Sequence, residues 1–184
     1  SPIISTITPD CQTATVDVVI SGGYPELFGG NFTASNLQPA TATFANTVIG
    51  NGGTITIVGL QNGDMYSFDI VDDNGCPHTI TGGPFVGLPT AIAGNDDQVC
   101  ALSYGLNAVP SFGTGTWTGA GTFNPSANDP NATVTVTSAG TYTFTWTEDN
   151  GGGCVSADDV VITFSNLSYV DNVVQSTCGN SDGE

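Results

Sequence analysis

The sequence has no lysine, no arginine and only one histidine, His78. Its 17 acidic residues therefore give a formal net charge of −17. Proteins that bind nucleic acids draw most of their affinity from Lys and Arg contacts with phosphates, so the missing cations exclude a nucleic-acid partner. The P-loop lysine of nucleotide hydrolases is absent for the same reason. A polyanion of this kind is instead expected to meet divalent cations, which lower its self-repulsion.

Long apolar runs are missing as well. No stretch approaches about 18 consecutive apolar residues, so we expect no membrane insertion. Charged residues make up only 9% of the chain and hydrophobic residues 39%, whereas glycine is abundant, with 25 residues. Few charges combined with many Thr, Val and Ile residues do not fit a disordered chain. This composition predicts an all-β protein with glycine-rich turns.

Six segments alternate apolar and polar residues, or run apolar, over the length of a strand. They are residues 13–20, 54–60, 66–71, 133–137, 142–147 and 159–164. Asn-Gly pairs separate several of them, among them Asn62-Gly63, Asn74-Gly75 and Asn150-Gly151. Both residues tolerate positive φ, which makes this pair the strongest short hairpin signal.

An internal repeat suggests two domains. The stretch YSFDIVDDNGC (66–76) resembles YTFTWTEDNGGGC (142–154), and the two tyrosines are 142 − 66 = 76 residues apart. That offset suits one small β-sandwich per copy. We therefore predict two tandem Ig-like/PKD-like β-sandwich domains, over residues 1–88 and 91–165, joined by the proline-containing link GLPTA (87–91).

The stretch VDDNGCPHTI (71–80) gathers acidic residues, a cysteine and the histidine, and it has two interpretations. It is either a metal or catalytic cluster, or a tight turn held by a disulfide. The repeat favours the turn, because Asn-Gly recurs at the same place in both copies. A single histidine, the missing cations and the lack of a Gly-x-Ser-x-Gly elbow argue against an enzyme, so we predict no catalytic residues.

The five cysteines are Cys11, Cys76, Cys100, Cys154 and Cys178. With one copy of the repeat per domain, the simplest pairing is Cys11–Cys76 and Cys100–Cys154, one disulfide in each domain. Each bond would add roughly 4 kcal/mol of stability by restricting the unfolded chain. Disulfides also imply an oxidising, extracellular location. Cys178 is left over, and we expect it to pair in a following domain, to stay free or to form an intermolecular bond.

The second half carries motifs of a known family. Residues 93–164 contain Ala-Gly-x-Asp before Cys100, a Gly-Thr-Trp strand and Gly-Thr-Tyr-x-Phe-x-Trp before Cys154. This region resembles the PKD-like/Ig-like repeats of very large Bacteroidota surface proteins. Residues 1–88, and the start of a similar segment in 166–184, resemble the repeats of gliding-motility adhesins.

This resemblance implies a secreted array of β-sandwich modules on a bacterial cell surface, exported by the type IX system. Residues 166–184 would begin a following repeat. The implied function is that of a structural repeat segment of an extracellular adhesin, stalk or filament, whose partners are neighbouring repeats of the same or identical chains. The family supplies no catalytic residues.

Calcium is the candidate ion, and no obligatory cofactor is expected. The candidate ligands are carboxylates, the hard oxygen donors that Ca²⁺ prefers: Asp72, Asp73, Asp96, Asp97, Glu148 and Asp149. If the domains stack end to end, the 72/73 and 96/97 pairs would approach each other at the junction. The alternative is a set of solvated acidic turns.

Two further functions stay open at this stage. One is a carbohydrate-binding module that uses exposed aromatic residues such as Tyr24, Phe28 or Tyr104 on surface glycans. The other is a self-assembling fibre subunit in which a terminal strand of one chain completes the next. We expect Trp117 and Trp146 to be core residues packed on a Cys100–Cys154 bond rather than a sugar platform.

Overall fold

A computed structural model describes residues 2–23 and 30–166, and this part of the chain folds into strands and loops. The first half forms two four-stranded sheets, ordered β1-β2-β6-β4 and β5-β3-β7-β8. The strands are β1 (Ile3–Asp10), β2 (Thr15–Gly22), β3 (Asn31–Gln38), β4 (Thr43–Phe44), β5 (Val48–Gly50), β6 (Thr54–Val58), β7 (Tyr66–Asp72) and β8 (Pro77–Gly82).

The second half also forms two sheets, ordered β11-β14-β15-β9 and β10-β13-β12. Most pairs are antiparallel, but β9 runs parallel to β15. The strands are β9 (Asp97–Val99), β10 (Ser103–Gly105), β11 (Thr114–Thr118), β12 (Thr122–Asn124), β13 (Thr133–Thr135), β14 (Gly140–Asp149) and β15 (Val155–Phe164). Within the described residues, no helix is long and apolar enough to cross a membrane.

Each half buries its own apolar core between its two sheets. Strict alternation places Tyr66, Phe68 and Ile70 of β7 inward, while the residues between them are only partly buried. Successive side chains of a strand point to opposite faces, so this pattern lines one face of a sheet. The first core lies within residues 16–85 and the second within 91–164, and the two share no residue. The fold is therefore all-β, with the sheets packed as sandwiches.

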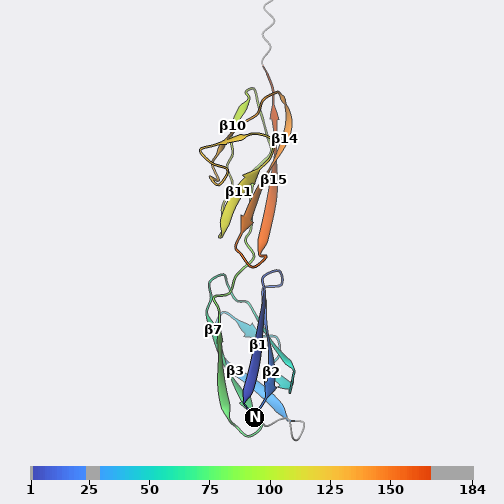
Figure 1. The fold of residues 1–184 in the computed structure, drawn as a ribbon, viewed down its shortest axis with the longest axis vertical. Helices are drawn as coiled ribbons and strands as arrows, with labels where there is room; N and C mark the ends of the chain where they lie inside the picture. The colour runs from blue at the N-terminus through green and yellow to red at the C-terminus, as the bar shows by residue number, and fades with distance from the viewer. Residues whose placement is uncertain (1, 24–29, 167–184) are drawn as a thin grey trace, which may run out of the picture.

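The two sandwiches lie end to end along the long axis of the molecule (Figure 1). The N-terminus lies at the far end of the first sandwich, and β1 runs from there toward the second. From the junction β15 then leads away through the second sandwich. We call the two ends of this assembly the N-pole and the C-pole, and the region between the sandwiches the joint.

The sequence pattern located the most regular strands. All six predicted segments overlap a strand, and 66–71, 142–147 and 159–164 lie wholly inside β7, β14 and β15. Among the strands of eight or more residues, the pattern missed β1 and β3. Strand β1 contains Pro9 and alternates between half-buried and exposed positions, and β3 has few apolar residues, such as the buried Phe32 and Ala34.

The predicted pairing of one disulfide per domain is wrong, because Cys11 is bonded to Cys154. In the first sandwich, Cys11 follows β1 at the joint. Strand pairing puts Asp72, at the end of β7, beside Phe32, and the neighbouring Asn31 beside Gly50, at the N-pole end of the sheet. The turn that holds Cys76 is thus about one strand length, roughly 25 Å, from Cys11. A disulfide requires Cα atoms within about 7 Å, so Cys11–Cys76 cannot form.

The same geometry excludes the second predicted bond. Cys154 lies just before β15, at the joint, whereas Cys100 follows β9, whose last residue Val99 pairs with Phe164 at the other end of β15. The ten residues of β15 separate the two cysteines by roughly 30 Å. Cys76 and Cys100 are exposed free thiols at opposite poles. Cys178 lies outside the described residues.

Candidate functional site

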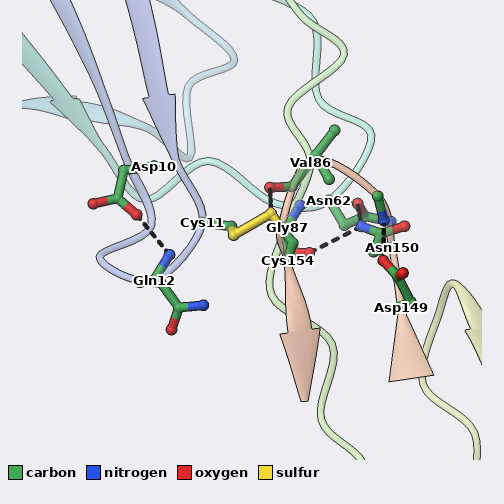
Figure 2. The surroundings of a disulfide bond; sticks show 10 residues. Asp10, Cys11, Gln12, Asn62, Val86, Gly87, Asp149, Asn150 and Cys154 are labelled. Carbon is green, nitrogen blue, oxygen red and sulfur yellow. Dashed lines mark hydrogen bonds between the residues drawn. A yellow bond between two sulfur atoms is a disulfide. The ribbon is translucent and has the colours of Figure 1, made fainter. Parts of the chain in front are cut away.

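The joint is built around the disulfide between Cys11 and Cys154, which are 143 residues apart in sequence with Cα atoms 5.9 Å apart (Figure 2). Cys11 lies in the turn from β1 to β2, where Asp10 Oδ1 accepts a hydrogen bond from Gln12 N at 2.8 Å. Cys154 is buried at the end of the β14–β15 turn. The bond therefore joins the first hairpin of one sandwich to the last hairpin of the other.

Beside the disulfide, two asparagines connect the sandwiches through polar contacts. Asn150 Nδ2 donates to Asn62 Oδ1 at 2.8 Å and to Gly87 O at 2.9 Å (Figure 2). Asn62 Oδ1 also accepts from Gly87 N at 3.0 Å. Asn62 belongs to the first sandwich, Gly87 to the connecting segment and Asn150 to the last hairpin of the second. One small network thus ties three separate parts of the chain together.

The connecting segment is held on both sides. Phe85 is buried in the first core, and its backbone bonds Gly63 and Asp64 at 2.8 Å each. Ala91 is buried in the second core. Between them, Thr90 N donates to Ser111 Oγ at 2.9 Å, and Val86 O lies 3.7 Å from the Cys154 sulfur, a contact only, because a disulfide sulfur carries no hydrogen. The link is therefore bound to the first sandwich at Phe85 and to the second sandwich at Thr90 and Ala91.

Glu148 anchors the second sandwich close to the joint. Its carboxylate is buried and accepts hydrogen bonds from Ser111 N at 3.0 Å, Ser111 Oγ at 2.6 Å and Trp146 Nε1 at 3.0 Å. Burial alone would raise the pKa of Glu148, but the hydrogen bonds from Ser111 and Trp146 outweigh it and hold the pKa below its usual range. Glu148 thus stays ionised and fixes the segment that also binds the link at Thr90.

The other predicted metal ligands accept hydrogen bonds, mostly from backbone amides, either within their own turns or from distant segments. Asp72 Oδ1 accepts from the amides of Asn74 and Cys76, Asp73 from Asn31 and Asp149 from Gly151. Asp96 accepts from Val161 N, and Asp97 accepts from Gln98 N and Tyr104 OH. Among the described residues, no three His, Cys, Asp or Glu side chains are grouped to hold a metal ion.

The expected meeting of the 72/73 and 96/97 pairs at the joint is wrong. Asp72 lies at the N-pole end of β7, and Asp97 pairs with Ile162 near the C-pole end of β15. The two pairs are thus at opposite ends of the assembly. The stretch 71–80 contains the turn between β7 and β8, as the repeat favoured, but the disulfide that would pin it is absent, because Cys76 is free.

Both tryptophans are core residues, as expected, but no disulfide lies under them. Trp117 and Trp146 pair across β11 and β14, with ring centroids 5.2 Å apart. Gly115 makes room for this pair, since a Cβ at this position would overlap the Trp146 ring. Of the aromatic residues proposed for glycans, Tyr24 and Phe28 lie outside the described residues, and Tyr104 lines a groove of about 440 Å³.

Sequence reasoning missed the residues of the joint. Asn62 and Asn150 were recognised only as turn formers, and the partner of Cys11 was sought inside its own domain. One signal was available: Cys76 and Cys154 end the same repeated motif, and so they lie at the same end of their sandwiches. Cys154 must then be close to the preceding sandwich, where Cys11 lies.

No family model matches the sequence, and no curated protein matches it. Solved structures are similar in fold. The C-terminal 282-residue fragment of intimin, solved in complex with the intimin-binding domain of its translocated receptor Tir, aligns with 90% of this chain at 12% identity and a TM-score of 0.54. This chain spans 63% of that fragment.

Two further structures overlap more loosely. DIP-gamma IG1+IG2 aligns with 90% of this chain and 97% of its own, at 11% identity and a TM-score of 0.37. Mouse cadherin-23 EC22-24 aligns with 86% and 61%, at 12% identity and a TM-score of 0.33. The similarity to intimin supports an Ig-like fold for the chain.

Proposed function

We propose that this chain is a non-enzymatic, extracellular segment of an adhesion-type cell-surface protein, in which two Ig-like sandwiches act as one stiff spacer. The observation that carries this proposal is the Cys11–Cys154 bond between the sandwiches. A bond across the joint fixes how two folded modules sit relative to each other. Disulfides persist in oxidising environments outside the cytosol, which supports an extracellular location.

The polar contacts of the joint support the same role. Ordinary interfaces between domains of one chain allow relative motion unless they are large and hydrophobic. Here the disulfide and the network of Asn62, Gly87 and Asn150 restrain the joint. We also propose a protein partner for the spacer, since the intimin fragment of similar fold was solved with a receptor domain.

Small-angle X-ray scattering tests the stiff spacer. The monomer of the oxidised wild-type chain, isolated by size-exclusion chromatography, should scatter as a single elongated body of fixed length. The Cys11→Ser/Cys154→Ser variant should show a range of bend angles and a broader distribution of dimensions. The matched control, Cys76→Ser/Cys100→Ser, removes two exposed thiols and should scatter like the wild type. Identical profiles for all three proteins would contradict the proposal.

The finer proposal is that the spacer belongs to a large Bacteroidota surface adhesin of the gliding-motility type, as a repeat segment of a stalk or filament. It is supported by the motifs around Gly115 to Trp117 and from Gly140 to Trp146. The sequence of the whole gene product tests it, and further copies of this two-module pattern are expected. A protein without such copies would contradict the array.

We propose that divalent cations promote association between neighbouring molecules. A formal charge of −17 keeps neighbouring molecules apart at low salt, and Ca²⁺ would reduce this repulsion. Light scattering of concentrated protein with Ca²⁺ and with excess chelator measures this effect. Equal association in both solutions would contradict it.

Glycan binding is a second candidate function, favoured by the groove beside Tyr104. Asp96, Asp97 and Asn107 line this groove together with the exposed side chains of Ile92 and Val109. Small-molecule sites combine aromatic and apolar side chains with a few polar groups that orient the ligand. Binding to a glycan array that is lost in Tyr104→Ala, and kept in the control Tyr142→Phe, would support this function.

A further inference from the structure

We propose that Cys76 and Cys100 are the two halves of a second joint, so that Cys100 of one copy of this chain bonds Cys76 of the next copy, head to tail. This inference rests on the proposed function as a spacer in an extended array. It does not rest on the exposed thiols alone, because the equivalent pair of positions, Cys11 and Cys154, is bonded within the chain.

Cys76 occupies the position of Cys154. Each cysteine closes the last hairpin of its sandwich, β7–β8 or β14–β15. The hairpins share the same order of residues, and Asn74 stands eight residues after Tyr66 as Asn150 does after Tyr142. The first hairpin thus presents, at the N-pole, the same asparagine and cysteine that the second uses at the joint.

Cys100 occupies the position of Cys11. Each follows the first strand of its sandwich, β1 or β9, at the end that faces away from the last hairpin. The two strands differ in their partners, since β1 pairs with β2 and β9 with β15, but both end at the same side of their sandwich. The chain also leaves each sandwich beside this cysteine: Ser165 N donates to Val99 O at 2.8 Å, and Val86 O contacts the Cys11–Cys154 bond.

The direction of the joint follows from this equivalence. The observed bond connects a first-strand cysteine to the last hairpin of the sandwich stacked on it. The expected partner of Cys100 at the C-pole is therefore a cysteine in the last hairpin of the sandwich stacked on it. Cys76, at the N-pole of a second copy, is such a cysteine. The two cannot bond within one molecule, because Cys76 follows β7 at the N-pole and Cys100 follows β9 at the C-pole, and these poles are the two ends of the elongated assembly (Figure 1). A head-to-tail contact of this kind generates open, linear chains.

The bond forms by thiol–disulfide exchange with a small disulfide such as oxidised glutathione. The Cys76 thiolate attacks one glutathione sulfur, which forms a mixed disulfide and releases one glutathione thiol. The Cys100 thiolate of the other copy then attacks the Cys76 sulfur and releases the second glutathione thiol. The two cysteines lose two protons and two electrons, and one glutathione disulfide becomes two thiols.

The test uses the full chain with Cys178→Ser, incubated with reduced and oxidised glutathione at a salt concentration that screens the acidic surfaces. Non-reducing electrophoresis should show a ladder of dimers, trimers and longer species. Peptide mapping should find Cys76–Cys100 bonds between molecules. The further variants Cys76→Ser and Cys100→Ser should each remain monomeric when incubated alone, with loss of the whole ladder. Their equimolar mixture should form dimers and no longer species, because each molecule keeps only one of the two cysteines.

Three results would overturn the inference. The first is a folded chain with an intact Cys11–Cys154 bond that stays monomeric under oxidation. The second is dimer formation by either single variant alone, which would show symmetric bonding. The third is a Cys100–Cys178 bond within one wild-type chain. Circular dichroism of each variant confirms folding, and scattering of the monomer tests the stiff spacer separately, so the failure of either proposal can be told from that of the other.

Discussion

The last hairpins of the two sandwiches share a sequence motif but have different surroundings. The β14–β15 hairpin lies in the joint, where Cys154 is bonded to Cys11 and Asn150 binds Asn62. The β7–β8 hairpin lies at the N-pole, where Cys76 is an exposed thiol. The repeat therefore specifies a hairpin, while the partner of its cysteine depends on which module lies next to that hairpin.

The carboxylates that precede the two hairpins differ in a similar way. Asp72 and Glu148 each stand six residues after the tyrosine of the repeat, and both are buried. Asp72 accepts from Asn74 and Cys76 within its own hairpin, whereas Glu148 reaches Ser111 in another part of its sandwich. One carboxylate stabilises a turn, and the other stabilises the packing next to the joint.

Breaking the disulfide should have the largest effect. Cys154→Ser removes a bond that closes a loop of 143 residues, which in the chain-entropy model is worth roughly 5 kcal/mol of unfolding free energy. Cys76→Ser, at the matching position of the other hairpin, should change it by less than about 0.5 kcal/mol. Chemical denaturation under oxidising conditions measures both, and equal losses would show that the two hairpins do not differ as described.

Replacing the buried carboxylates should have the next largest effect. Glu148→Gln places an amide NH₂ among three donors and should cost the second sandwich about 2 kcal/mol. Asp72→Asn can keep one acceptor oxygen toward its own turn and should cost about 1 kcal/mol. Circular dichroism follows the denaturation of both sandwiches, and Trp fluorescence follows the second sandwich, which contains both tryptophans. A larger loss for Asp72→Asn would reverse the assignment of roles.

Removing the asparagine side chains should have a smaller effect. Asn150→Ala deletes the hydrogen bonds to Asn62 and Gly87 and should cost about 1 kcal/mol, with more bending at the joint in scattering. Asn74 makes no side-chain hydrogen bond within the described residues, so Asn74→Ala should stay within about 0.5 kcal/mol. Equal losses of unfolding free energy for Asn150→Ala and Asn74→Ala would mean that the hydrogen bonds of Asn150 add no net stability.

Lowering the pH should produce the smallest effect, a loss of stability through Glu148 that begins only in acid. The pKa of Glu148 is lower in the folded state, because Ser111 and Trp146 stabilise its carboxylate despite burial. Its contribution is therefore fully present above the unfolded pKa and is lost as the pH falls through the folded pKa. As the pH is lowered from neutral into acid, the melting temperature should fall less steeply for Glu148→Gln than for the wild type. Parallel curves would contradict this linkage.

Much of the fold followed from the sequence, because strand periodicity and Asn-Gly turns are local signals. The alternation in β7 and β14 and the 76-residue repeat predicted two sandwiches. Strand β3 was missed because the inward-facing Phe32 and Ala34 stand among polar residues. The disulfide was mispaired because spacing along the chain does not tell at which end of a sandwich a cysteine lies. The acidic residues were identified, but their amide partners, such as Ser111 and Asn31, come from distant segments.

The Cys11–Cys154 bond also decides how the molecule would respond to tension. A pull applied at Ile3 and Phe164 travels along β1, crosses the sulfur atoms and continues along β15, so the 143 residues between the cysteines carry none of it. Oxidised, the chain can lengthen by roughly 500 Å less than when reduced. Under strain the load is then borne by one continuous covalent path, made of β1, the sulfur bridge and β15.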